Sequence, residues 1–167
     1  MSRRIKKVAV LGSGIMGSGI ACHFGNIGLE VLMLDIVPPN LSESDSKNPK
    51  ARNSIVDQAL QAAIKSRPAA LYDKSYASRI QTGNLTDDLE KIKDYDWIIE
   101  VVIERLDIKK QLFERVDQYR TPGTLVTSNT SGIPIHLMAE GRSEGFKKHF
   151  CGTHFFNPPR YLRLLEI

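Results

Sequence analysis

A glycine-rich segment near the start of the chain restricts the fold more than any other feature of the sequence. It fits the pattern G-x-G-x-x-G and reads Gly12-Ser13-Gly14-Ile15-Met16-Gly17. An apolar run over 7–11 precedes it, and a segment of helical character over 15–27 follows, closed by Gly28. A strand, a tight glycine turn and a helix in this order begin a doubly wound sheet. We therefore predict a Rossmann-type α/β fold: a mostly parallel sheet with helices on both faces.

The rest of the chain continues this alternation. Apolar runs predict strands over 30–36, 78–81, 97–103, 124–127, 150–156 and 161–167. Helical spacing and turn signals predict helices over 51–66, 87–92, 107–119 and 133–139, with 37–50 as a polar loop. In the helix over 51–66, the residues expected to face the core are Ile55, Ala59, Ala62 and Ala63. Because no repeat or linker interrupts the order, we expect residues 1–167 to form one domain.

Composition narrows the class of protein. No apolar run approaches the roughly 18 residues needed to cross a bilayer. The apolar stretch after the basic start is too short for a signal peptide, and Cys22 and Cys151 lie too far apart in the sequence to suggest a disulfide framework. We therefore expect a cytoplasmic protein that does not bind a membrane. The net charge of +4 is too mild to indicate a nucleic-acid partner, and no Cys/His cluster indicates a metal site.

The glycine segment also predicts a dinucleotide site. Gly14 would let the backbone approach a pyrophosphate, and the N-terminus of the following helix would offer it N–H groups and a positive dipole. Asp35 ends the next strand, where a carboxylate accepts hydrogen bonds from the ribose. The residues after Asp35 include no Arg or Lys to hold a 2′-phosphate, so NAD is favoured over NADP. The motif alone excludes neither FAD nor a glycine turn without a ligand.

Polar residues follow the three later strands at the edge where ligands bind open parallel sheets. Glu104 follows the strand over 97–103, and Lys109 comes one helical turn later. The run Ser128-Asn129-Thr130-Ser131-Gly132 follows the next strand, and Asn157 follows the strand over 150–156. Helix capping before Ile133 would explain one hydroxyl of this run but not four polar side chains in a row. We therefore predict that the three strands line one crevice.

His154 and Glu166 form a candidate pair. If the chain turns back antiparallel about Arg160, these two residues face each other on adjacent strands. We expect both to be buried, because their neighbours in the sequence are apolar. A carboxylate beside a histidine orients the imidazole and stabilises its charged form, as a general base requires. A structural ion pair would use the same two residues, and the residues alone leave the two interpretations open.

Several segments together resemble the 3-hydroxyacyl-CoA dehydrogenase family, in the same order and over almost the whole chain. They are the segments 12–21, 96–104 and 128–131, and then His154–Pro158 with Leu165-Glu166 after it. The sequences of residues 129–134 and 158–162 are most similar to those of the large bacterial and archaeal members, which often carry an enoyl-CoA hydratase-like region.

The resemblance implies roles for these residues. His154 matches the family's catalytic base, Glu166 its partner, and Ser131 the residue that contacts the substrate oxygen and the cofactor. Asp35 matches the ribose ligand, and the positions near the nicotinamide end are Glu104, Lys109 and Asn157. The implied reaction is the oxidation of L-3-hydroxyacyl-CoA to 3-oxoacyl-CoA with NAD, in fatty-acid β-oxidation.

The family also has a C-terminal helical domain, which these 167 residues do not include. The resemblance implies that this domain supplies much of the acyl pocket and the contact of a homodimer. Without it, we expect the chain to bind NAD but to turn over substrate poorly. Two other functions stay open: a superfamily dehydrogenase of a small 3-hydroxy acid without CoA, and a non-catalytic NAD-sensing module. His154 and Glu166 count against the second, because NAD binding needs neither residue.

Overall fold

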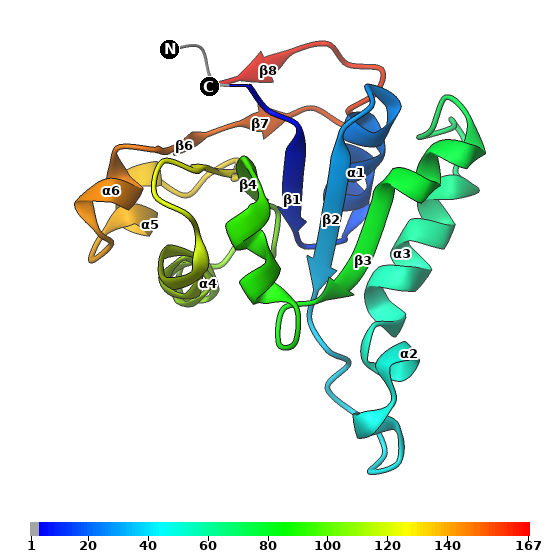
Figure 1. Ribbon diagram of the computed structural model, residues 1–167. Coiled ribbons are helices and arrows are strands. Elements are labelled where there is room, and N and C mark those ends of the chain that lie inside the picture. The colour runs from blue at the N-terminus through cyan, green and yellow to red at the C-terminus, as the bar shows by residue number, and fades with distance from the viewer. Residues whose placement is uncertain (1–3) are drawn as a thin grey trace.

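The strand–glycine–helix unit is present as predicted. The computed structural model describes residues 4–167, in which β1 (Lys7–Leu11) leads through the glycine turn into α1 (Ile15–Asn26). The other strands of the main sheet are β2 (Glu30–Asp35), β3 (Ile80–Asn84), β4 (Trp97–Glu100), β5 (Leu125–Ser128) and β6 (Phe150–Gly152). All are parallel, in the order β3-β2-β1-β4-β5-β6 (Figure 1). This is the Rossmann order, in which the strand sequence reverses beside β1.

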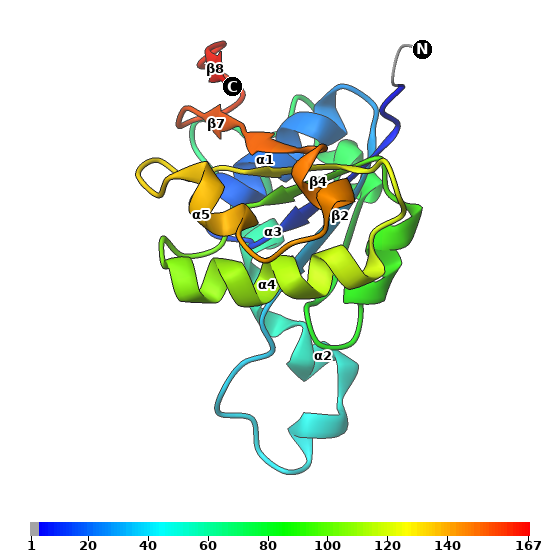
Figure 2. The same ribbon diagram turned by 90° about the vertical axis from the view of Figure 1, so that its left-hand side faces the viewer.

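Helices cover both faces of the sheet because successive strand residues point to opposite sides. Val8 and Val10 pack with α1 and with α3 (Ser54–Ile64). Ala9 and Leu11 belong to the opposite cluster, which includes Leu112 and Phe113 of α4 (Leu106–Tyr119). The short helices α5 (Ile135–Ala139) and α6 (Glu144–Lys147) lie on this second side (Figures 1 and 2). Burial on two faces explains why the strand segments are continuously apolar.

Three predicted strands are shorter than their apolar runs. β4 ends at Glu100 rather than at residue 103, and just beyond it the Glu100 carboxylate, rather than a neighbouring strand, accepts the backbone N–H of Val102 at 2.7 Å. The predicted strand over 150–156 is divided at Thr153 into β6 and β7 (His154–Phe155). Of the predicted strand over 161–167, only β8 (Leu165–Glu166) forms, and it pairs with β7 outside the main sheet.

The helix predictions differ in phase and type. The predicted helix over 51–66 is two helices, α2 (Pro49–Arg52) and α3, separated at Asn53. The buried face of α3 consists of Val56, Leu60 and Ala63, so the predicted inner face was wrong except at Ala63. The break at Asn53 sets a new helical phase, which the alanine spacing did not indicate. Short 3₁₀ helices lie at Asp45–Lys47, Lys74–Arg79 and Leu89–Asp94, the last near the predicted helix over 87–92.

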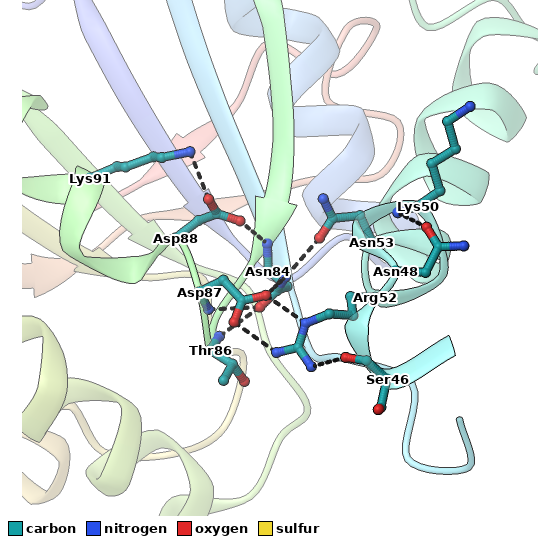
Figure 3. Close-up of polar contacts among 10 residues, drawn as sticks. All are labelled: Ser46, Asn48, Lys50, Arg52, Asn53, Asn84, Thr86, Asp87, Asp88 and Lys91. Atoms are coloured by element: carbon teal, nitrogen blue, oxygen red, sulfur yellow. Dashed lines mark hydrogen bonds and ion pairs between the residues drawn. The ribbon is translucent and has the colours of Figure 1, made fainter. Parts of the chain in front are cut away.

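The segment between β2 and α3, residues 36–53, projects beyond the end of β2 (Figures 1 and 2). We call it the projecting segment. Its base is attached to the end of β3 by polar contacts (Figure 3). Arg52 donates to both oxygens of Asp87 at 2.7 Å, and the buried Asn84 amide donates to Asn53 at 2.7 Å and to Asp87 at 2.8 Å. Within residues 4–167, no helix is long and apolar enough to cross a bilayer.

Candidate active site

The glycine turn has the shape that a pyrophosphate site requires. Gly12 has a φ of 109°, and a Cβ there would lie 2.6 Å from the carbonyl oxygen of Val101. A Cβ at Gly17 would lie 1.9 Å from the carbonyl oxygen of Gly12, so α1 can approach the turn only with glycine there. A Cβ at Gly14 would meet no atom of residues 4–167 within 4 Å. The turn is therefore closed against its own chain and open to a ligand at Gly14.

The N-terminus of α1 follows Gly14, which has no side chain to cap it. Ile15 is 81% exposed there, while Met16 packs against the core. Beside this helix end, Asp35 accepts hydrogen bonds from the backbone N–H and the hydroxyl of Ser13, at 2.6 and 2.5 Å. Its other oxygen accepts the N–H of Ile36 at 2.7 Å. These contacts hold the Asp35 carboxylate beside the glycine turn, as an adenosine ribose would require.

Three candidate catalytic groups come together from the loop after β5, from β7 and from β8. Ser131 Oγ lies 3.1 Å from His154 Nε2, and His154 Nδ1 lies 2.9 Å from Glu166 Oε2. The antiparallel pairing of His154 with Glu166 is confirmed, and Phe155 pairs with Leu165 in the same register. Since Nδ1 faces a carboxylate, it carries the ring proton, and Nε2 is left to accept. A histidine oriented in this way can take a proton from a hydroxyl placed beside Ser131.

The burial predicted for this pair is wrong. The His154 side chain is 28% exposed and that of Glu166 is 60% exposed. The physical reason is that β7 and β8 pair over only two residues each, outside the main sheet. A cavity of about 310 Å³ borders both residues and Ser131, with Ile133, Ile135 and Ile167 as part of its apolar wall. The pair therefore faces open space that a substrate could enter.

Glu104 contacts the loop that carries Ser131. Its Oε1 accepts the backbone N–H groups of Ser131 and Gly132, both at 3.1 Å, and the hydroxyl of Thr130. Its Oε2 lies 3.2 Å from the ammonium of Lys109. Burial would raise the pKa of Glu104, but the bonds from Thr130 and Gly132, with the charge of Lys109, outweigh it and lower the pKa to about 2. Glu104 therefore stays ionised at any physiological pH.

Lys109 lies inside the protein. Its side chain is 1% exposed, and its ammonium lies 2.7 Å from Glu100 Oε1, with the Glu100 side chain 0% exposed. Burial raises the pKa of Glu100 above its ordinary value, against the opposing effects of Lys109, Ser128 and the Val102 N–H. The predicted contacts of Glu104 and Lys109 with the cofactor stay predictions, and the Lys109 ammonium would have to leave this environment to make one.

Asn157 lies near the glycine turn. It borders a cavity of about 540 Å³ together with Ser13, Gly14 and Ser66. This cavity lies between the start of α1, the end of α3 and the segment 157–161. Asn157 thus lies near the start of α1, and its predicted contact with the nicotinamide stays a prediction.

The sequence analysis missed Glu100, and it did not identify the partners of the polar run at 128–131. Glu100 was counted among the apolar residues of a strand over 97–103, and a carboxylate in such a run was the available signal. Asn129 accepts the backbone N–H of Phe155 at 2.8 Å and so joins the loop after β5 to β7. The alternative of helix capping before Ile133 is wrong, because α5 begins at Ile135 without a side-chain cap; Thr130 Oγ1 instead accepts the Ile133 N–H within the loop, at 3.1 Å. The four polar side chains at 128–131 therefore have four different partners.

Comparison with known proteins agrees with this geometry. Residues 7–167 match the family model described as "3-hydroxyacyl-CoA dehydrogenase, NAD binding domain". The chain is 53% identical to a probable 3-hydroxyacyl-CoA dehydrogenase of Bacillus subtilis, covering 100% of this chain and 22% of that protein. It is 48% identical to one of Deinococcus radiodurans, over 98% of this chain and 45% of that protein. The chain thus spans less than half of each relative.

A solved structure extends the comparison to three dimensions. The (S)-3-hydroxybutyryl-CoA dehydrogenase of Ralstonia eutropha superposes with a TM-score of 0.71 at 30% identity, over 97% of this chain and 53% of that one. The family match covers nearly every residue that the structure describes, including the glycine turn and His154. The chain belongs to the 3-hydroxyacyl-CoA dehydrogenase family, as its NAD-binding domain.

Proposed function

We propose that this chain supplies the NAD site and the catalytic base of an enzyme that oxidises L-3-hydroxyacyl-CoA to 3-oxoacyl-CoA, in fatty-acid β-oxidation or a related CoA pathway. The observation that carries the proposal is His154, held between Ser131 and Glu166 beside an open cavity. Binding of NAD alone needs neither His154 nor Glu166, so their arrangement favours catalysis over a sensing role.

The residues present fit NAD. Gly14 leaves room for the pyrophosphate at the start of α1, and Asp35 is held where the ribose hydroxyls would lie. Ile15 and Met16 open the helix whose N–H groups would face the phosphates, and Asn157 borders the cavity beside it. When bound, NAD supplies the acceptor for the hydride that leaves C3 of the substrate.

The chain's own residues handle the proton. Ser131 Oγ orients the substrate hydroxyl by a hydrogen bond, and His154 Nε2 takes the hydroxyl proton. Glu166 holds the ring through Nδ1 and stabilises the imidazolium that results. In this scheme His154 is the base and accepts the proton at Nε2, and Glu166 acts only through His154.

We further propose that residues 1–167 act as one domain of a longer protein. The relatives are longer than this chain, and the His154 cavity is open on one side, which a helical region such as the family's would cover. Such a region would bind the acyl chain and carry a homodimer contact. A cytoplasmic location suits an enzyme that uses NAD and CoA thioesters.

The test is turnover by the full natural protein with NAD. We expect NADH to form from 3-hydroxybutyryl-CoA and much more slowly from free 3-hydroxybutyrate. His154→Ala should lower kcat by about 10²–10⁴-fold, the usual contribution of a placed base. His149→Ala is the matched control, since His149 bonds the Gly145 carbonyl before β6 and should leave the rate unchanged.

Each failure has its own meaning. NAD binding without turnover of either compound would contradict the enzyme proposal and favour a sensing module. Equal turnover of the free acid would replace the thioester with a small 3-hydroxy acid as substrate. A full rate in His154→Ala would show that the base lies elsewhere.

A further inference from the structure

A buried ammonium joins two carboxylates behind the Ser131 loop. Lys109 Nζ lies 2.7 Å from Glu100 Oε1 and 3.2 Å from Glu104 Oε2. The Glu100 and Lys109 side chains are both almost fully buried, at the carboxyl end of β4 and in the first turns of α4. A buried charge is costly unless it is paired and hydrogen-bonded. The Glu100 carboxylate accepts hydrogen bonds from three donors: Lys109 Nζ, the Val102 N–H and Ser128 Oγ.

Glu100 is connected to both ends of the loop that carries Ser131. At the start of the loop, Ser128 Oγ donates to Glu100 Oε2 at 2.5 Å, and the Asn129 N–H donates to the Glu100 carbonyl at 2.9 Å. At the tip, Glu104 holds the N–H groups of Ser131 and Gly132, and Lys109 connects Glu104 back to Glu100. Two of the attachments of this loop, at its start and at its tip, therefore lead to Glu100.

We infer that Glu100 is a positioning residue for Ser131, acting through Lys109 and Glu104, and that it touches neither substrate nor cofactor. Stability alone does not account for such a pair, because apolar residues of similar volume often replace a buried ion pair without loss. Two directional carboxylates instead fix where the loop lies relative to His154. The kinetic part of the inference rests on the proposed function, and the exchange measurement below does not.

The kinetic test is a double-mutant cycle between Glu100→Gln and Ser131→Ala in the full natural protein. Glu100→Gln should lower kcat by about 10- to 10²-fold, the scale of a misplacement of about 1 Å, while KM changes less. In the Ser131→Ala background the same substitution should have almost no further effect on kcat. An equal decrease in both backgrounds would show that Glu100 acts on the fold in general, and it would overturn the inference.

Thr127→Val is the matched control. Thr127 lies on β5 and is as buried as Glu100, and its hydroxyl is bonded to Trp97 Nε1 at 3.0 Å and Thr153 Oγ1 at 2.7 Å. It contacts a different set of residues from Glu100, so its substitution should lower stability and change kcat by the same factor with or without Ser131. Should Glu100→Gln fail to fold, Glu104→Gln enters the same cycle, because that side chain is partly exposed and belongs to the same chain of contacts.

Amide hydrogen exchange gives a readout that does not depend on activity. Glu100→Gln should speed amide exchange at residues 129–133 and leave exchange over β2 unchanged. Thr127→Val should not speed exchange at 129–133 more than elsewhere in the sheet. If the wild-type protein turns over no 3-hydroxyacyl-CoA, the proposed function fails and this measurement alone decides the inference. Unchanged exchange at 129–133 in Glu100→Gln would overturn it.

Discussion

Two polar clusters at the same edge of the sheet differ in how deeply they are buried. At the ends of β2 and β3, Arg52 and Asp87 attach the projecting segment with side chains that are 23% and 45% exposed (Figure 3). At the ends of β4 and β5, Lys109 and Glu100 are 1% and 0% exposed. Both pairs join a helix to a strand end. Water can solvate the charges of Arg52 and Asp87 if their contact breaks, but it does not reach Lys109 and Glu100. Only the buried pair should therefore hold its neighbouring segments tightly in place.

Their carboxylates also respond to pH in opposite directions. Hydrogen bonds from Arg52 and Asn84 lower the pKa of Asp87 below its ordinary value. Burial raises the pKa of Glu100. A lowered folded-state pKa gives stability that is present above the ordinary pKa and lost as the pH falls. A raised folded-state pKa gives stability that is present at low pH and lost as the pH rises. Lowering the pH should therefore weaken the attachment of the projecting segment through Asp87 before it weakens the contacts of Glu100.

The largest expected effect on stability comes from Lys109→Met. It leaves the Glu100 carboxylate buried without its cation, which typically costs about 3–5 kcal/mol of the free energy of unfolding at neutral pH. The loss should shrink as the pH falls, because protonation of Glu100 removes the uncompensated charge. Urea denaturation over a pH series measures both. Lys110→Met is the matched control, since Lys110 pairs with Glu140 at the surface. Equal losses of stability in the two variants would show that burial does not make the Lys109–Glu100 pair more important than a surface pair.

Glu166→Gln tests the exposed side of the active site. It keeps the size of the side chain and removes its charge. If that charge stabilises a His154 imidazolium, as we propose, kcat should decrease by about tenfold to 10²-fold with little change in NAD affinity. Steady-state kinetics and NAD titration of the full natural protein separate the two effects. Glu144→Gln, at an exposed ion pair with Lys147, is the control. A folded Glu166→Gln enzyme with full activity would make the pair structural.

Asp35→Ala concerns the adenosine end. If the carboxylate holds the ribose hydroxyls, the variant should lose about 1–3 kcal/mol of NAD binding free energy. The wild-type protein should also bind NAD more tightly than NADP, because Asp35 repels a 2′-phosphate, and the preference should narrow in the variant. Calorimetry with both cofactors measures this, with Asp45→Ala in the projecting segment as control. Equal affinities in the wild type would refute the assignment of Asp35.

The smallest effect should come from Arg52→Met. Both members of this pair contact water, so the change in unfolding free energy should fall within the scatter of repeated denaturation measurements. Hydrogen exchange should nevertheless increase in the projecting segment, and added salt should reduce the difference from wild type. A loss of stability as large as that of Lys109→Met would show that exposure does not separate the two clusters.

The sequence predicted the parts of the molecule that depend on local chemistry. The glycine turn, the doubly wound parallel sheet and the His154–Glu166 pairing follow from φ preferences, strand periodicity and a simple antiparallel register. Burial of that pair was predicted wrongly, because apolar neighbours do not reveal that a two-residue ribbon lies outside the sheet. The role of Glu100 was missed for the same reason, since its partners Lys109 and Ser128 come together only by packing.

The break at Thr153 separates the main sheet from the two-stranded ribbon of β7 and β8, which carries His154 and Glu166. The parallel sheet ends in β6, whereas His154 belongs to a ribbon attached by the Asn129–Phe155 bond and by Arg160, which donates to the carbonyls of Ala69 and Leu71 at 2.6 and 2.8 Å. The glycine turn therefore follows a strand of the main sheet, whereas His154 lies in the ribbon. If His154 is the base and the glycine turn binds NAD, substitution of Asn129 or Arg160 should therefore change the rate of turnover more than the affinity for NAD.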